Sequence, residues 1–291
     1  MGNRTIIRAT LVGAALLLVG AALAFAWQRR SGEDMLGQAV AGEARAGGLS
    51  LALNPAVANV RVTEARVPGR PLIVIDAGHG GKDPGAAGAS GRALEKDVTL
   101  QLARDLRDLL AKNGRVRVAL TREGDTYLTL DDRAAIARRL GADLFLAIHA
   151  DSAANAQARG ATFYSLSEVA SDADAALLAA RQNGEGAVAS EPDGSLRALL
   201  ADVAARDEMA ASADFAVRLL RQAQGNIPLR PEPHRFAAFR VLRRSDAPAV
   251  LFEAGYMSSA ADEAMLLDPA QRARIVAALA RAIEAQAAAA R

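Results

Sequence analysis

The sequence predicts an α/β fold with a central mixed, mostly parallel sheet, helices on both faces and an all-helical insertion. From Leu72 onward, short apolar runs alternate with segments of helical periodicity. This alternation is typical of βαβ units, whose helices cover both faces of a sheet. Strand signals are missing between residues 171 and 224 and return afterwards, which predicts the insertion.

The elements follow in a regular order from the first apolar run, 72–76. Residues Val98, Leu102, Leu106 and Leu109 share one helical face, and Asn113-Gly114 ends that helix. A second helix is capped by Asp131 and stopped by Gly141. Further strands are predicted at 116–120, 144–148, 161–165, 239–242 and 249–252, and a closing helix follows Pro269.

The N-terminus predicts export. Arg4 and Arg8 precede an uncharged apolar run from Ala9 to Trp27. Residues 1–27 therefore indicate either a signal peptide or an uncleaved membrane anchor, since about 20 apolar residues can span a bilayer. Residues 28–70 contain prolines and no sustained period, which predicts a linker. The remaining domain is expected at 71–290, with the helical insertion at about 171–224.

Composition narrows the chemistry. The formal net charge is only +2, and no cluster of Lys and Arg is interleaved with aromatic residues, so no nucleic-acid partner is expected. Cysteine is absent, which excludes disulfides, cysteine nucleophiles and thiolate metal sites. Any metal must be held by histidines and carboxylates.

Four residues at element ends form a candidate site. Apolar strands lead to His79, His149 and Glu253, and Glu95 directly precedes a helix. Ligands and chemistry collect at the carboxyl ends of strands in open α/β sheets. Two imidazoles and one carboxylate are the ligands of a catalytic zinc. We therefore predict that His79, Glu95 and His149 bind Zn²⁺.

Each ligand has an alternative interpretation. The glycines around His79 could cradle a phosphate, but the Lys-Ser/Thr ending of a P-loop and the dinucleotide glycine pattern are missing. His79 and His149 could also be structural histidines. Glu95 could simply complement a helix dipole. Asp151 is a candidate for orienting the His149 ring.

Glu253 is predicted to be the general base, because a glutamate at the end of an apolar strand is costly to bury without a role. The alternative is a buried ion pair with Arg122 or Arg133. His234, the third histidine, lies in a proline-rich segment that predicts a loop. We interpret it as a surface or substrate-contact residue and not as a ligand.

The same residues carry a family resemblance. The segments are Val74–Ala86, Glu95–Asp97, Thr121-Arg122 with Asp125, Leu130 and Arg133, Ala142–Asp151, and Phe252–Tyr256. Over residues 72–288 the chain resembles the zinc-dependent N-acetylmuramoyl-L-alanine amidases that separate dividing cells. The resemblance implies a zinc held by His79, Glu95 and His149, with Glu253 as the catalytic glutamate. Together with the N-terminal run at 1–27, which predicts export, it indicates a periplasmic enzyme that is either free or anchored to the inner membrane.

The implied substrate is peptidoglycan, cut at the amide between N-acetylmuramic acid and L-alanine. In regulated relatives a helical insertion covers the site until an activator protein displaces it, and a glutamate on that helix reaches the zinc. In this chain Gln182 occupies the position where that glutamate is expected, and Glu185 follows three residues later. Two other functions stay open: a zinc peptidase or other amidohydrolase, and a catalytically silent cell-wall regulatory protein.

Overall fold

A computed structural model describes residues 57, 59–153, 158–184, 196–243 and 245–289. The predicted signal peptide or anchor at 1–27 lies outside these residues, as does Glu185. Among the helices described, none is long and apolar enough to cross a membrane.

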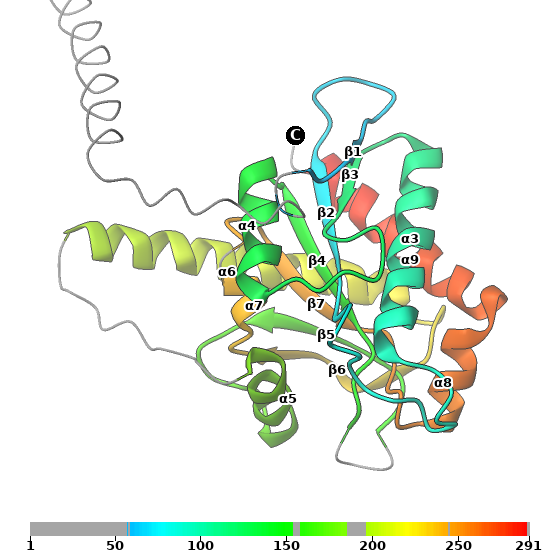
Figure 1. Cartoon of the computed structure of the whole chain (residues 1–291). Coiled ribbons are helices and arrows are strands. Elements are labelled where there is room, and N and C mark those ends of the chain that lie inside the picture. Colours follow the sequence, from blue (N-terminus) through cyan, green and yellow to red (C-terminus); the bar gives the residue numbers. More distant parts are fainter. Residues whose placement is uncertain (1–56, 58, 154–157, 185–195, 244, 290–291) are drawn as a thin grey trace, which may run out of the picture. The chain divides into compact units, whose positions relative to one another are not determined.

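Seven strands form one mixed sheet in the order β1-β3-β2-β4-β7-β5-β6 (Figure 1). Strands β3, β2, β4 and β7 run parallel, β1 and β5 pair antiparallel to their neighbours β3 and β7, and β6 is parallel to β5. This arrangement confirms the predicted mixed, mostly parallel sheet. The strands are β1 Val62–Thr63, β2 Leu72–Ala77, β3 Arg117–Leu120, β4 Leu144–His149, β5 Ala161–Leu166, β6 Leu229–Ala237 and β7 Ala249–Glu253.

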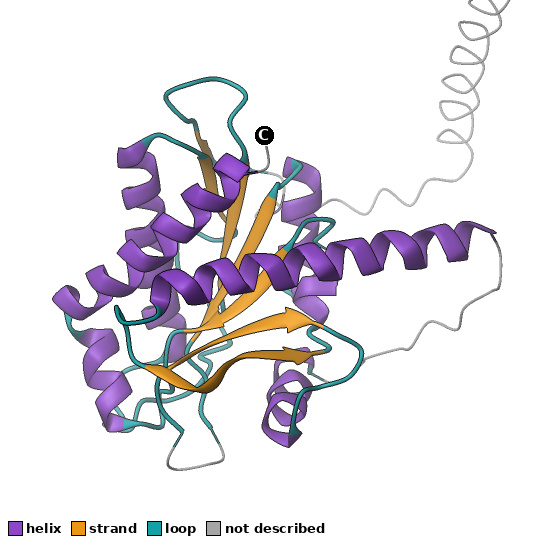
Figure 2. Ribbon diagram, turned by 180° about the vertical axis from the view of Figure 1, so that it is seen from behind, coloured by secondary structure: helices purple, strands orange, loops and turns teal. Residues whose placement is uncertain are grey.

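Helices cover both faces of the sheet, as predicted. The first face packs against α3 Glu95–Asn113, α6 Leu196–Ala223, α8 Ala260–Leu267 and α9 Pro269–Ala289. In Figure 2 the long helix α6 runs across this face. The second face packs against α4 Leu130–Leu140, α5 Ala173–Asn183 and α7 Arg240–Arg243.

The sequence signals placed most elements correctly. Strands β2 and β4 are buried at every residue, which is why they occur as continuous apolar runs. Gly114 and Gly141 end α3 and α4 in the left-handed conformation, with φ of 64° and 62°. The cap of α4 is Thr129 and not Asp131, because Thr129 forms a capping box with Asp132.

Two expectations near the sheet edges were wrong. Residues 231–235, expected as a proline-rich loop, lie in β6. This strand is at the edge of the sheet, where a proline without an N–H group is tolerated. Residues 239–242, expected as a strand, mostly form α7. The linker 28–70 is also shorter than predicted, because β1 pairs with β3 and Val57 is buried in the core.

The segment 171–224 is helical in its described residues, but it is not a separate lobe. Phe215, Ala216, Leu219 and Ala223 are fully buried in the core beneath β5 and α9. On the other face of the sheet, α5 buries only Ala175, Leu178 and Ala179. The second half of α6 is therefore part of the structural core.

We predict that Phe215→Ala lowers the free energy of unfolding by about 3–5 kcal/mol, the usual cost of emptying a buried aromatic site. Val217 lies on the same helix with 42% of its surface exposed, so Val217→Ala should change stability by no more than about 0.5 kcal/mol. Urea denaturation of both variants measures the difference. Equal, small effects would show that α6 does not belong to the core.

Candidate metal centre

Three neighbouring parallel strands deliver three of the four predicted site residues. His149 ends β4 and lies in register with Glu253, which ends β7. His79 follows the end of β2 by two residues. Residues in register on adjacent strands project from the same face of the sheet. The side chains of His149 and Glu253 therefore share the face that carries α4, α5 and α7.

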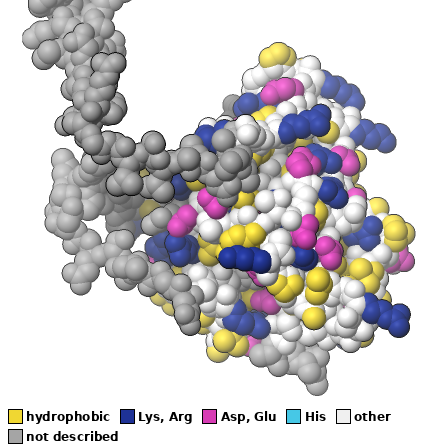
Figure 3. Space-filling view, viewed as in Figure 1, with side chains coloured by type: hydrophobic (Ala, Val, Ile, Leu, Met, Phe, Trp, Pro, Cys, Tyr) yellow, Lys and Arg dark blue, Asp and Glu magenta, His cyan; other side chains and the backbone are white. Residues whose placement is uncertain are grey.

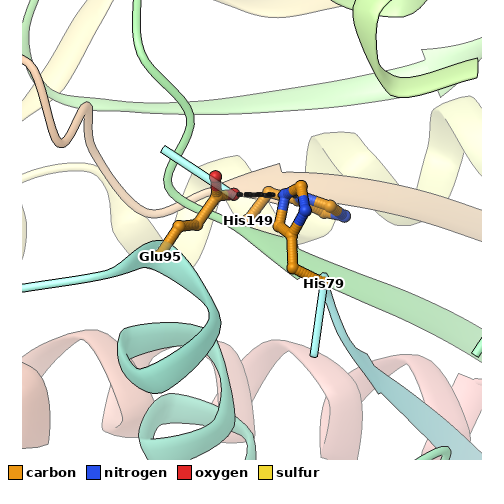
Figure 4. A group of neighbouring side chains, drawn as sticks. All are labelled: His79, Glu95 and His149. Carbon is orange, nitrogen blue, oxygen red and sulfur yellow. Dashed lines mark hydrogen bonds and ion pairs between the residues drawn. The ribbon is translucent and has the colours of Figure 1, made fainter. Parts of the chain in front are cut away.

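Glu95 joins the two histidines. It is the first residue of α3, and its fully buried carboxylate points at both imidazoles (Figure 4). Its Oε1 lies 3.1 Å from His79 Nε2 and 3.2 Å from His149 Nδ1. The same oxygen accepts a hydrogen bond from the Ala150 N–H at 3.0 Å, and Oε2 accepts one from the Ala86 N–H at 2.9 Å.

Glycines make this close approach feasible. A Cβ atom at Gly78 would lie 2.4 Å from the His149 ring. One at Gly85, whose φ is +65°, would lie 2.6 Å from Glu95 Oε2. His79 itself has a φ of 61°, which is uncommon for a residue with a side chain. The glycine-rich sequence around His79 is thus explained by side-chain packing and a sharp turn, without a phosphate.

Asp83 orients the His79 ring, a role that the sequence analysis missed. Its Oδ2 lies 2.8 Å from His79 Nδ1, and its Oδ1 accepts a hydrogen bond from the Gly85 N–H. The spacing of four residues between His79 and Asp83 was the available signal. Asp151, the expected partner of His149, has no hydrogen bond to that ring among the described residues, because its Oδ1 accepts from the Ser152 N–H and its Oδ2 faces Arg181.

Charge and burial shift the protonation of the centre. Burial alone would lower the pKa of His79, but the carboxylates of Glu95 and Asp83 raise it to about 9. Burial would raise the pKa of Glu95, yet its contacts with His149 and His79 hold it far below its usual value. Glu95 is therefore an ionised carboxylate inside the protein, and its contacts with the two imidazoles and with two backbone N–H groups offset the cost of its burial.

Glu253 lies beside this centre and is fully buried. Its Oε2 accepts a hydrogen bond from the Asp151 N–H at 2.9 Å, whereas Oε1 has no hydrogen-bond partner among the described residues. Burial, followed by the negative charges of Asp151 and Glu95, raises the pKa of Glu253 well above its usual value. A carboxyl group with a free oxygen and a raised pKa is suited to accept and return a proton.

The alternative role of Glu253 in an ion pair with Arg122 or Arg133 is wrong. The guanidinium of Arg133 binds Asp76 at 2.8 Å. That of Arg122 donates to backbone carbonyls, including those of Ala77 and Gly78.

His234 lies away from the centre. Its Nε2 is 2.9 Å from Ser165 Oγ, and that hydroxyl also contacts the Ser212 carbonyl of α6. His234 therefore belongs to the α6 side of the sheet, opposite the face that carries His149. Its place in β6 gives it a structural contact and no access to the cleft.

A cleft of about 320 Å³ opens at His79 and His149. The end of α5 forms part of its wall, and Arg181 Nη2 lies 3.6 Å from Asp151 Oδ2. Other lining residues are Asp76, Asp83, Gly85, Ala86, Tyr127, Leu128, Leu130, Arg133, Gln182, Asn183 and Gly184. On the face shown in Figure 3, basic and acidic side chains are interspersed and form no single basic patch.

The centre fits a zinc ion. One ligand atom from each of His79, Glu95 and His149 lies within 4.8 Å of the others. The buried Nε2 of His79 is close to Glu95 but forms no hydrogen bond within the described part of the chain, which leaves a polar atom without a partner there. Two nitrogens and one carboxylate oxygen are a zinc donor set, and Asp83 supplies the outer contact that metal-binding histidines usually have.

Comparisons with known proteins show which family this chain resembles. Residues 73–285 match the family described as N-acetylmuramoyl-L-alanine amidase. The chain is 36% identical over 220 residues to the N-acetylmuramoyl-L-alanine amidase AmiA of Escherichia coli (strain K12). The aligned region covers 74% of this chain and 75% of AmiA.

Two solved structures have a similar fold. The catalytic domain of CwlV, an N-acetylmuramoyl-L-alanine amidase from Bacillus (Paenibacillus) polymyxa, is 28% identical with a TM-score of 0.53, and 73% of this chain covers 96% of that domain. The N-acetylmuramoyl-L-alanine amidase AmiC2 of Nostoc punctiforme is 29% identical, also with a TM-score of 0.53, over 74% of this chain and 96% of that one.

We predict that His79→Ala, Glu95→Ala and His149→Ala each lose bound zinc, because a centre with three protein ligands does not retain the ion with two. Elemental analysis of the purified proteins measures this. His234→Ala is the matched control and should keep the zinc content of the unmodified chain. Full zinc occupancy in one of the three variants would remove that residue from the ligand set.

Proposed function

Since the chain belongs to the N-acetylmuramoyl-L-alanine amidase family, we propose that it is a zinc-dependent peptidoglycan hydrolase. The proposed cut is the amide between N-acetylmuramic acid and the L-alanine of the stem peptide, in cell-wall remodelling and daughter-cell separation. The family match confirms the resemblance seen in the motifs and favours an amidase over a peptidase or a silent regulator. The periplasm is the proposed compartment.

The observation that carries this proposal is the buried Glu95 carboxylate between two imidazoles, with Glu253 on the adjacent strand end. His79, Glu95 and His149 would hold the zinc. When bound, zinc supplies Lewis acidity, which polarises an amide carbonyl and lowers the pKa of water. The cleft beside His79 and His149 gives a muramyl peptide access to this point.

Glu253 is the proposed proton carrier. Its Oε2 is fixed by the Asp151 N–H, so the carboxyl group has one orientation and presents Oε1. Oε1 can take a proton from the attacking water and return it to the nitrogen of the departing L-alanine. Positioned proton transfer of this kind contributes about 10²–10⁴-fold to the rate.

We predict that Glu253→Gln keeps its zinc and its fold but releases stem peptides from purified peptidoglycan at least about a hundredfold more slowly. The amide fills the same volume and cannot accept the proton. Glu284→Gln is the control, because this carboxylate contacts Asn113 and Arg115 on the α9 side of the sheet. Near-normal turnover by Glu253→Gln would disprove the role.

We further propose that α5 restricts the cleft until an activator protein displaces it. Arg181, Gln182 and Asn183 line the cleft wall. The helix end is fixed by Asn183, whose amide donates to the Ala238 carbonyl and accepts from the Arg240 N–H, both at 2.8 Å. The regulatory part of segment 171–224 is then α5, because the second half of α6 is needed for the core.

We predict that Asn183→Ala raises basal peptidoglycan cleavage by about fivefold, the effect of losing about 1 kcal/mol of docking free energy. Zinc content should not change. Asn226→Ala is the matched control, since its amide contacts only carbonyls at the end of α6. If both variants cleave at the rate of the unmodified chain, α5 does not limit access.

A further inference from the structure

A buried arginine on β6 lies beneath α5. The side chain of Arg230 is only 9% exposed, and its Nη2 lies 2.5 Å from Asp174 Oδ2 in the first turn of α5. Its Nη1 donates to the Tyr256 hydroxyl at 3.0 Å. Tyr256 follows Glu253, the last residue of β7, by three residues. The hydrogen bond to Tyr256 therefore links the Arg230 guanidinium to the segment that follows the proposed catalytic glutamate.

Arg230 obtains its counter-charge from a helix that is only lightly docked. Within the described residues, Asp174 is the one carboxylate that contacts it, and that carboxylate is 46% exposed. Arg235, the other buried arginine of β6, also donates to backbone carbonyls of its own strand, at Pro231 and Glu232. Arg235 is thus held by its strand, whereas Arg230 needs an anion from outside.

Arg230 is linked to the cleft through the residues beneath α5. Arg230, Tyr256 and Arg181 line one small hollow under α5, and Arg181 also lines the cleft. Asp174 and the cleft residue Gln182 are eight helical residues apart, which corresponds to about 12 Å. An extended peptide covers this distance in about three to four residues.

We propose that Arg230 binds a carboxylate of the stem peptide and that Asp174 occupies this position while α5 is docked. The inference rests on the proposed amidase function and adds a substrate contact to it. Beyond L-alanine, the stem peptide carries free carboxylates on its second and third residues. A guanidinium matches a carboxylate in shape and charge, and here it is largely screened from water.

The test uses zinc-loaded full-length protein and muramyl tripeptides that differ only in a carboxylate or a carboxamide on the second or third residue. The unmodified chain should cleave one acid form with a kcat/KM about 10- to 100-fold above its amide form, mainly through KM. Arg230→Gln should abolish this preference. Arg243→Gln, which removes an exposed pair with Glu168, should retain it.

Asp174→Asn tests the same idea without altering the arginine. It should lower KM for the preferred acid substrate more than for the amide substrate, because it frees Arg230 as well as loosening α5. An equal gain on both substrates would mean that Asp174 only docks α5, and this outcome would overturn the proposal. So would equal cleavage of acid and amide by the unmodified chain. Failure of both the unmodified chain and Asn183→Ala to cleave any muramyl peptide would instead reject the amidase function.

Discussion

One buried carboxylate organises the active region. Glu95 accepts hydrogen bonds from Ala86 in the loop after β2 and from Ala150 after β4, and it contacts both histidines. An ionised group without water is costly unless every neighbour compensates it. The loop, the start of α3 and the end of β4 must therefore come together correctly, or none of them is stable in this arrangement.

Two buried arginines bind the backbone at the end of β2 and in the turn that follows it. Arg122 and Arg133 donate to the carbonyls of Ala77, Gly78 and His79, the residues where β2 turns into the loop. These contacts satisfy carbonyl groups at the end of β2 and in the turn after it, and they hold His79 at its unusual positive φ. The arginines of the sequence motif thus fix the backbone that presents a ligand, and neither neutralises Glu253.

The sequence could predict those features of the fold and the site that depend on a local pattern of residues. Apolar strands buried on both faces were visible, and so were the polar residues that end them, since His149 and Glu253 interrupt continuous apolar runs. The role of Asp83 depends on the turn geometry of the glycine loop. The role of Arg230 depends on α5, a helix distant in sequence. The prolines of β6 concealed a strand, because their tolerance at a sheet edge depends on the order of strands.

The segment 171–224 shows why an Ala-rich helical stretch cannot be divided from sequence alone. In α6, Phe215 and Leu219 are fully buried, and each large apolar side chain stabilises the fold by about 1.5–3 kcal/mol. In α5 the buried set is two alanines and Leu178, and both ends of the helix are held by polar contacts. Polar contacts contribute less net free energy to stability, because water or another ligand can replace them. A similar composition therefore conceals that large apolar side chains anchor α6 in the core, whereas α5 is held mainly by polar contacts.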